Sequence, residues 1–278
     1  MRALLLSALF CLVGACSSAS HEHEAASGAE GPPMRVISLD YCSDQYVLAL
    51  IDKDQILALS PDADNKFSYL HEQADGIRQV RPVAESILAL QPDLVVRSYG
   101  GGPNIAALLE RAGIPVVQVG WANDFNGIRT VLMDMAVSLE AEEKGEAILA
   151  DFDARMAAIE AREGGTALYV TPGGVTSGPG GLVHDMLVAA GLQNFQEAPG
   201  WRDLPLERMV HETPDVVAAA FYETIHRQPS IWSASRHSVV RDALSDAETV
   251  PLEGAWTSCG AWYLIEAIEA LSERGQTE

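Results

Sequence analysis

Five aromatic side chains follow short apolar segments that are typical of buried strands. An aromatic ring buries a large apolar area and presents a flat face. In open parallel sheets, ligands bind at the edge formed by the carboxyl ends of the strands. We therefore predict a cleft for a ligand with flat or apolar faces, lined by Tyr41, Tyr99, Trp121, Trp201 and Tyr222. The alternative for each ring is packing in the core.

Two arginines lie beside members of this aromatic set. Arg97 precedes Tyr99 closely in the sequence, and Arg202 directly follows Trp201. A guanidinium group can hold a carboxylate through two parallel hydrogen bonds. Both arginines are therefore candidate ligand-binding residues, and the alternative is that each is a solvated surface residue.

Familiar catalytic and metal-binding motifs are absent from the sequence. It contains no Gly-x-Ser-x-Gly, no Cys-x-x-Cys and no His-Glu-x-x-His. The histidines beyond the N-terminal segment are scattered, although His184 or His237 could ligate a haem or a metal. The glycine-rich segment 173–181 lacks the Gly-Lys-Ser/Thr ending of a phosphate-binding loop, so we expect it to line the cleft. We predict no catalytic residue, no metal site and no cofactor.

The N-terminal segment has the features of an export signal. Arg2 precedes an apolar run that is too short to span a bilayer as a helix. The run ends in Val13-Gly14-Ala15-Cys16, which resembles a bacterial lipobox. We predict a signal peptide over residues 1–15 and lipidation at Cys16, with a plain signal peptide as the alternative. Residues 16–33 are rich in Ser, Ala, Gly, Glu and Pro and predict a flexible tether.

Two cysteines remain in the processed chain. Export places Cys42 and Cys259 in an oxidising compartment, where two leftover thiols usually pair. We therefore predict a Cys42–Cys259 disulfide.

Strand-like and helix-like segments alternate on both sides of a long helical region. This alternation predicts an α/β fold with parallel sheets. Between them, residues 124–163 contain no proline and place apolar residues at helical spacing, which predicts one long helix, with a possible break near Gly145. The strand-like segments lie at 35–39, 56–59, 94–96, 114–119, 167–170 and 216–218.

An internal repeat relates the two halves of the chain. The pattern Glu-x-apolar-apolar-x-x-x-Pro-Asp-apolar-Val begins at Glu85 and again at Glu207, an offset of 122 residues. Chance is a poor explanation for so many positions in register. We infer two similar lobes, residues 34–123 and 164–278, joined by the helix at 124–163.

These features resemble the substrate-binding proteins of ABC importers for iron-siderophores, haem and cobalamin. The resemblance covers residues 34–272 and is most specific at 84–102 and 201–217. It implies a ligand cleft between the lobes, limited opening because a helix joins them, and docking of one Glu from each lobe on arginines of the permease. Glu85 and Glu207 occupy these positions, and Trp201 matches an aromatic of the cobalamin-binding members. The segment that starts the first helix, with Cys42, departs from the usual pattern.

Charge favours some ligands and partners over others. The formal net charge of −21 opposes binding to nucleic acid or to anionic lipid. It also opposes a highly anionic chelate, whereas cobalamin carries many neutral amides. We therefore rank cobalamin first, ferric siderophore second and haem third as the ligand, and we expect a monomeric, lipid-anchored periplasmic protein that delivers its ligand to an inner-membrane ABC permease.

Two other functions stay open at this point. A receptor for free zinc or manganese would need three or four His, Asp or Glu side chains converging in the cleft. An exported enzyme on a similar scaffold would need an acid–base pair near residues 171–181, where His184 and Asp185 are the nearest titratable residues.

Overall fold

The computed structural model of the chain describes residues 34–221 and 238–273. The expected signal peptide, the lipidation site Cys16 and the tether lie outside these residues, as do Tyr222 and His237. From Met34 onward the chain forms one compact unit.

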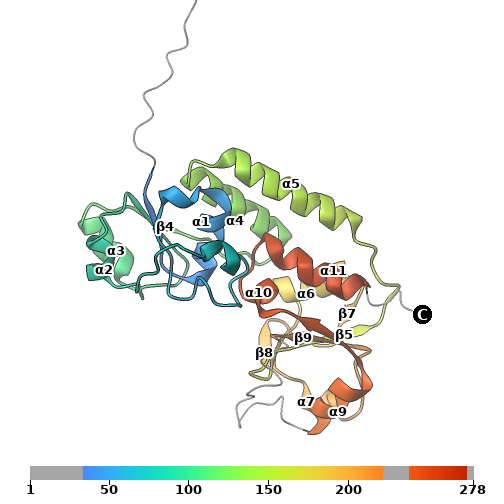
Figure 1. The fold of residues 1–278 in the computed structure, drawn as a ribbon. Coiled ribbons are helices and arrows are strands. Elements are labelled where there is room, and N and C mark those ends of the chain that lie inside the picture. The colour runs from blue at the N-terminus through green and yellow to red at the C-terminus, as the bar shows by residue number, and fades with distance from the viewer. Residues whose placement is uncertain (1–33, 222–237, 274–278) are drawn as a thin grey trace, which may run out of the picture. The chain divides into compact units, whose positions relative to one another are not determined.

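The N-terminal lobe is built on a parallel four-stranded sheet (Figure 1). Its strand order is β2-β1-β3-β4, and all three pairings are parallel. Its strands are β1 (Val36–Ser38), β2 (Ile56–Ala58), β3 (Leu94–Arg97) and β4 (Val116–Gln118), and its helices are α1 (Tyr41–Leu50), α2 (Ala84–Leu88) and α3 (Ile105–Arg111), with short 3-10 turns at Lys53–Gln55 and His71–Ala74.

The C-terminal lobe repeats this plan and adds a small antiparallel pair. Its parallel sheet has the order β10-β9-β5-β7, and β6 pairs with β8. The strands are β5 (Thr166–Val170), β6 (Val175–Ser177), β7 (Gln193–Asn194), β8 (Trp201–Asp203), β9 (Val216–Ala220) and β10 (Glu248–Leu252). The helices are α6 (Leu182–Ala189), α7 (Leu206–Met209), α9 (Ser238–Asp246), α10 (Gly254–Thr257) and α11 (Ile265–Glu273), with a 3-10 turn at Trp262–Leu264.

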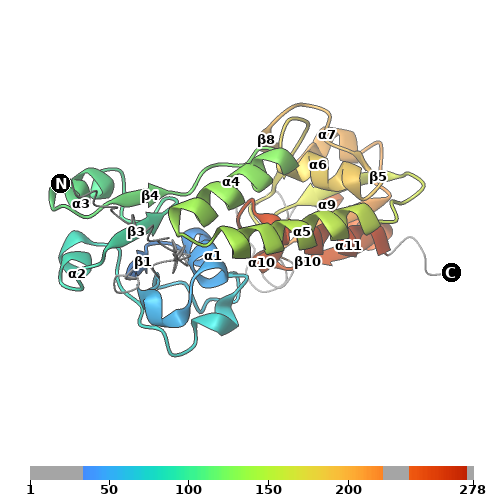
Figure 2. The same cartoon turned by 90° about the horizontal axis from the view of Figure 1, so that it is seen from above.

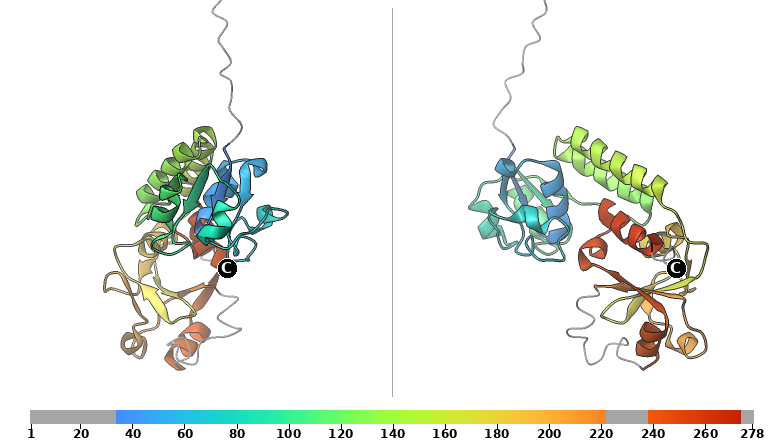
Figure 3. Two further views of the ribbon diagram at one scale, coloured as in Figure 1. Left: turned by 90° about the vertical axis from the view of Figure 1, so that its left-hand side faces the viewer. Right: turned by 45° about the vertical axis from the view of Figure 1, so that its right-hand side comes forward.

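Two helices occupy residues 124–163, so the expectation of one unbroken helix is wrong, and the alternative of a break in this region is confirmed. They are α4 (Phe125–Ser138) and α5 (Glu142–Ala158), which lie side by side (Figures 2 and 3). The chain turns at Glu140, which adopts a left-handed conformation with φ of 54°. Gly145 lies inside α5, where any Cβ would collide with Ala136 of α4. That glycine therefore allows close packing of the two helices and does not break either one.

The repeated Pro-Asp motif has the same structural role in each lobe. Asp93 precedes β3 and accepts a hydrogen bond from the backbone N–H of Arg35 at 2.8 Å. Asp215 precedes β9 and accepts one from the backbone N–H of Thr166 at 2.7 Å. In both lobes these hydrogen bonds lower the pKa of the aspartate. Each aspartate thus fixes the start of a neighbouring parallel strand.

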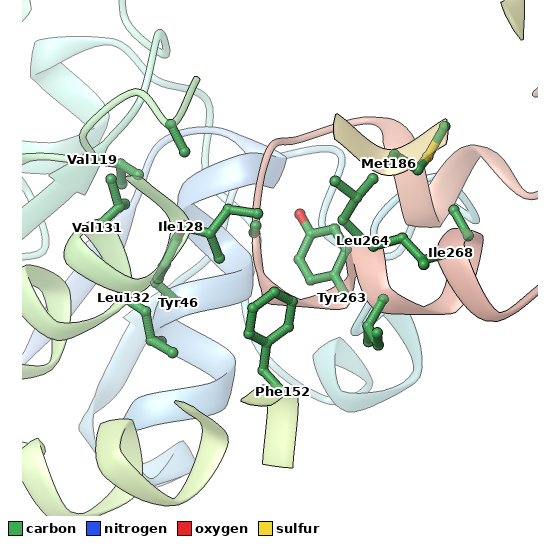
Figure 4. Packing of buried hydrophobic residues seen from close by; sticks show 14 of the residues in the cluster. Tyr46, Val119, Ile128, Val131, Leu132, Phe152, Met186, Tyr263, Leu264 and Ile268 are labelled. Atoms are coloured by element: carbon green, nitrogen blue, oxygen red, sulfur yellow. The ribbon is translucent and has the colours of Figure 1, made fainter. Parts of the chain in front are cut away.

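Strand residues alternate between separate parts of the core, as the pleat of a strand requires. In β3, Val95 packs in a cluster with Ile37 and Leu109, whereas Val96 packs in the large central cluster. The C-terminal sheet likewise has its own outer cluster, which includes Phe195 and Val217. The central cluster contains residues of both lobes and of the helices between them (Figure 4). The two lobes therefore share one continuous core.

Candidate functional site

A pocket of about 430 Å³ lies at the carboxyl ends of strands from both lobes. Four of the five predicted aromatics line it, namely Tyr41, Tyr99, Trp121 and Trp201. The other lining residues come from α1, from the loops after β3 and β4, from the β6–β8 pair and the residues beside it, from α6, and from the end of α10 and the segment that follows it: Cys42, Tyr46, Ser98, Val119, Gly120, Ala122, Asn123, Ser177, Gly180, Gly181, Leu182, Val183, Met186, Gly200, Thr257, Ser258, Cys259, Gly260 and Leu264.

The aromatic rings are unusually exposed for side chains of their size. Trp121 is 81% exposed, Trp201 60% and Tyr99 53%. Single exposed apolar residues are common on protein surfaces, but several around one concave pocket mark a binding site. Tyr99 makes an edge-to-face contact with Tyr41, and their ring centroids are 5.8 Å apart. The pocket can therefore offer flat apolar faces from both lobes to one ligand.

In the N-terminal lobe, the ends of adjacent strands place the aromatics. Tyr41 is the first residue of α1, directly beyond β1, and Tyr99 follows β3. Trp121 follows β4, the outer neighbour of β3 in the sheet. These three positions agree with the sequence-based expectation that ligand-facing residues follow the strands.

In the C-terminal lobe, the antiparallel pair β6–β8 places Trp201. Trp201 pairs with Ser177, and the ring of Trp201 contacts that of Tyr169 edge-to-face with centroids 6.2 Å apart. The glycine-rich segment then turns into α6, and Gly180 and Gly181 line the pocket. The strand pair could not be predicted from the sequence, because three residues are too few to show a period.

The two arginines do not line the pocket. Arg97 lies on the same face of β3 as Val95, away from the central core, and its Nε has no hydrogen-bond partner among the described residues. Arg202 follows Trp201 on β8, so its side chain leaves the opposite face of the strand, and its Nε donates to the carbonyl of Pro199 at 2.9 Å. The expectation that either arginine grips a ligand in this pocket is therefore not supported by their positions.

A disulfide crosses from one lobe to the other at the pocket. It joins Cys42 in α1 to Cys259, with a Cα–Cα distance of 5.8 Å. Both cysteines line the pocket. The apolar spacing at 256–272 predicts one final helix, but the chain leaves the helical path between α10 and α11, which brings Cys259 to the pocket wall.

The two repeated glutamates lie outside the pocket, one on each lobe. Glu85 is in the first turn of α2 and Glu207 in the first turn of α7, and both side chains are exposed. Neither glutamate forms an ion pair within the described part of the chain. Exposed apolar residues accompany them, Val83 and Leu88 beside Glu85 and Val210 beside Glu207.

Chemistry other than ligand binding has little support among the described residues. No group of three His, Cys, Asp or Glu side chains converges there to hold a metal ion. His184 is absent from the pocket lining, and its Nδ1 faces the amide nitrogen of Asn194 at 3.5 Å. Burial raises the pKa of Asp185 beside it. None of the helices in the described ranges has the length and apolar character needed to cross a bilayer.

A curated relative and two solved structures are similar to the chain. A vitamin B12-binding protein of Vibrio campbellii is 31% identical over 140 residues, and the match spans 49% of this chain and 49% of the relative. The periplasmic haem-binding protein HutB of Vibrio cholerae has a TM-score of 0.72 at 16% identity, covering 88% of this chain and 99% of that one. The periplasmic vitamin B12-binding protein BtuF of Vibrio cholerae has a TM-score of 0.57 at 18% identity, covering 87% of this chain and 96% of that one.

These comparisons carry different weight. The chain spans about half the length of the curated relative. The solved structures are too distant in sequence to show more than the fold. A model of the periplasmic binding protein family, however, matches residues 36–222, which is more than half of the chain and includes strands of both lobes. The two-lobed α/β protein described here therefore belongs to the periplasmic binding protein family.

Proposed function

We propose that this chain is the extracytoplasmic solute-binding component of an ABC importer, and that its ligand is a large molecule with flat apolar faces. The observation that carries the proposal is the set of four aromatics from both lobes around one pocket. Apolar surface buried against such rings contributes roughly 25 cal/mol per Å². A small hydrated ion would gain nothing from these walls.

A corrinoid is the ligand that we place first. A cobalamin is larger than the pocket, so it would protrude past the exposed rings of Trp121 and Trp201, which suits their position at the rim. Because its amides are neutral, it is also repelled less by the negative charge of the protein than an anionic chelate would be. The curated relative, a vitamin B12-binding protein, supports this order. A ferric siderophore is the second choice, and its anionic forms would find neither Arg97 nor Arg202 in the pocket lining.

Haem is the third candidate, and the two tyrosines in the pocket favour it specifically. A tyrosine phenol can serve as an axial ligand of haem iron. Tyr41 and Tyr99 are neighbours in the pocket, and structurally similar proteins include haem-binding ones. His184, the other haem ligand considered from the sequence, is absent from the pocket lining.

The remaining parts of the proposal concern delivery. Glu85 and Glu207 would dock on arginines of the inner-membrane permease, one from each lobe. Cys16 would carry the lipid that anchors the chain, and residues 16–33 would be the tether. We propose that the protein acts as a monomer. Binding of free zinc or manganese would require a cluster of ligands that the described residues do not provide.

Native mass spectrometry of the protein purified from its own host tests the proposed ligand class. The expected result is a non-covalent complex with the mass of a corrinoid, or with that of haem or a ferric chelate in the lower-ranked cases. A complex with zinc or manganese alone would contradict the proposal.

A further inference from the structure

The side chain of Asp40 binds two parts of the pocket wall at once. Its Oδ1 accepts a hydrogen bond from the backbone N–H of Ser43 at 3.0 Å and so caps α1. Its Oδ2 accepts three more from the loop that follows β3, from the backbone N–H groups of Ser98 at 2.7 Å, Tyr99 at 3.0 Å and Gly100 at 2.8 Å. One carboxylate thus joins the start of α1 to a loop that is far away in the sequence.

These contacts are of a strong kind. Hydrogen bonds to an ionised carboxylate are stronger than those between neutral groups. Successive backbone N–H groups form a concave site for an anion, and the Asp40 side chain fills that site. Asp40 is only 3% exposed, so water competes little for these donors. Gly100 allows the close approach, because any Cβ there would collide with the backbone of Leu39.

Both segments that Asp40 joins carry pocket residues. Tyr41 and Cys42 follow it in α1, and Ser98 and Tyr99 lie in the bound loop. The edge-to-face contact between Tyr41 and Tyr99 depends on how these segments sit against each other. Resting on the proposed function, we propose that Asp40 is a positioning residue that holds the Tyr41–Tyr99 wall in the shape that the ligand requires.

Asp93 offers a matched control in the same pair of strands. It lies at the opposite end of β3. Its carboxylate also accepts a hydrogen bond from a backbone N–H group, that of Arg35, which directly precedes the neighbouring strand β1. It does not line the pocket. Loss of Asp93 should therefore affect the same sheet without moving the Tyr41–Tyr99 wall.

The first test needs no ligand. In Asp40→Ser the short hydroxyl can still cap α1 but cannot reach the loop. Hydrogen exchange of the purified full chain should then be faster by about tenfold or more at the amides of residues 98–100, with the amides of α1 little changed. Unchanged exchange at 98–100 would overturn the proposal. Asp40→Asn, which keeps the shape of the side chain, is the second variant if the serine variant does not fold.

The second test measures affinity for cyanocobalamin by calorimetry. Asp40→Ser and Tyr99→Ala should each weaken binding by about tenfold, and the double variant should lose little more, because both changes remove the same wall. Asp93→Ser should bind within about twofold of the wild type. Wild-type affinity in Asp40→Ser, or losses that multiply in the double variant, would contradict the positioning role. If the wild type binds none of cyanocobalamin, haemin and a ferric siderophore, the proposed function fails, and the exchange result alone decides whether Asp40 holds the loop.

Discussion

Trp201 and Arg202 are neighbours on β8, yet only the tryptophan lines the pocket. We predict that Trp201→Ala weakens binding of the ligand by about tenfold or more, since an aromatic residue that contacts the ligand commonly contributes about 2 kcal/mol. Titration calorimetry with cyanocobalamin, or with whichever ligand co-purifies, measures the change.

Arg202→Ala is the control for this prediction. It changes the next residue of the same strand, whose side chain points the other way, and it should leave the affinity unchanged. A loss with Arg202→Ala that equals the loss with Trp201→Ala would mean that the strand, and not the ring, matters for binding.

At the level of residues, the sequence predicted the aromatic lining better than the polar one. Tyr41, Tyr99 and Trp121 follow strands, and the edge of a parallel sheet brings such positions together. The two arginines were wrongly expected in the pocket, because the face of the sheet to which a side chain points depends on the register of its short strand. The link from Asp40 to the loop at 98–100 gave no local signal, since these partners are distant in the sequence.

The contact between α1 and the residues after β2 depends on Asp44. The carboxylate of Asp44 is buried and accepts hydrogen bonds from the backbone N–H of Ser60 at 3.1 Å and from its hydroxyl at 2.6 Å. Burial raises the pKa of Asp44 from its ordinary 3.8 to about 6. The folded protein therefore holds this proton over a range of pH in which the unfolded chain has already lost it.

This difference predicts how stability depends on pH. Between pH 4 and 6 Asp44 ionises first in the unfolded chain, so the contribution of Asp44 to the free energy of unfolding should fall as pH rises, by about 3 kcal/mol. In Asp44→Asn, which can keep both contacts with Ser60, that fall should be absent. Urea denaturation at a series of pH values from 4 to 7 measures the free energy of unfolding of the wild type and of Asp44→Asn. Curves of stability against pH that run parallel for the two proteins would contradict the prediction. Asp93 and Asp215 do not account for a difference in this range, because their pKa values are lowered and they lose their stabilising effect only at lower pH.

At the level of elements, the alternation of strands and helices predicted both parallel sheets. The possible break was expected near Gly145, whereas the chain turns at Glu140, with neither glycine nor proline to mark the turn. Gly145 was the more conspicuous signal, but it serves the packing of one helix on the other. The end of the chain was also misjudged, since the apolar spacing at 256–272 continues across the turn that carries Cys259.

On the scale of residues 34–273, several contacts join the two lobes besides the α4–α5 pair. The central core is shared, Tyr69 stacks on Tyr263 with ring centroids 4.4 Å apart, and the hydroxyl of Ser258 donates to the carbonyl of Phe67 at 3.0 Å. The Cys42–Cys259 disulfide adds a covalent link beside the pocket. These contacts favour a pocket whose width changes little when ligand binds.

Removal of the disulfide should reduce stability without preventing folding. We expect the Cys42→Ser/Cys259→Ser variant to lose about 2–4 kcal/mol in free energy of unfolding, because the shared core still holds the lobes together. Urea denaturation measures the loss, and the wild type under reducing conditions should match the variant. Two free thiols in non-reduced peptide maps of the wild type would show that the link does not form.

In the proposed function, the protein docks on a permease through one glutamate from each lobe. Glu85→Arg or Glu207→Arg should impair ligand uptake by cells that carry the importer, because a like charge would face the permease arginine, while affinity for the ligand stays within about threefold. Glu110→Arg, an exposed position on α3 that brings the same change in net charge, is the control and should support normal uptake. Normal uptake with both test variants would remove the docking role from these glutamates.

Direct titration tests whether the pocket between the lobes binds a large ligand with flat apolar faces. The purified protein is titrated in turn with cyanocobalamin, haemin, a ferric siderophore and zinc, with heat and tryptophan fluorescence recorded together. We predict one site per chain and quenching of tryptophan fluorescence, with the tightest binding for cyanocobalamin. Tight binding of zinc, with neither heat nor quenching from the other three, would contradict it.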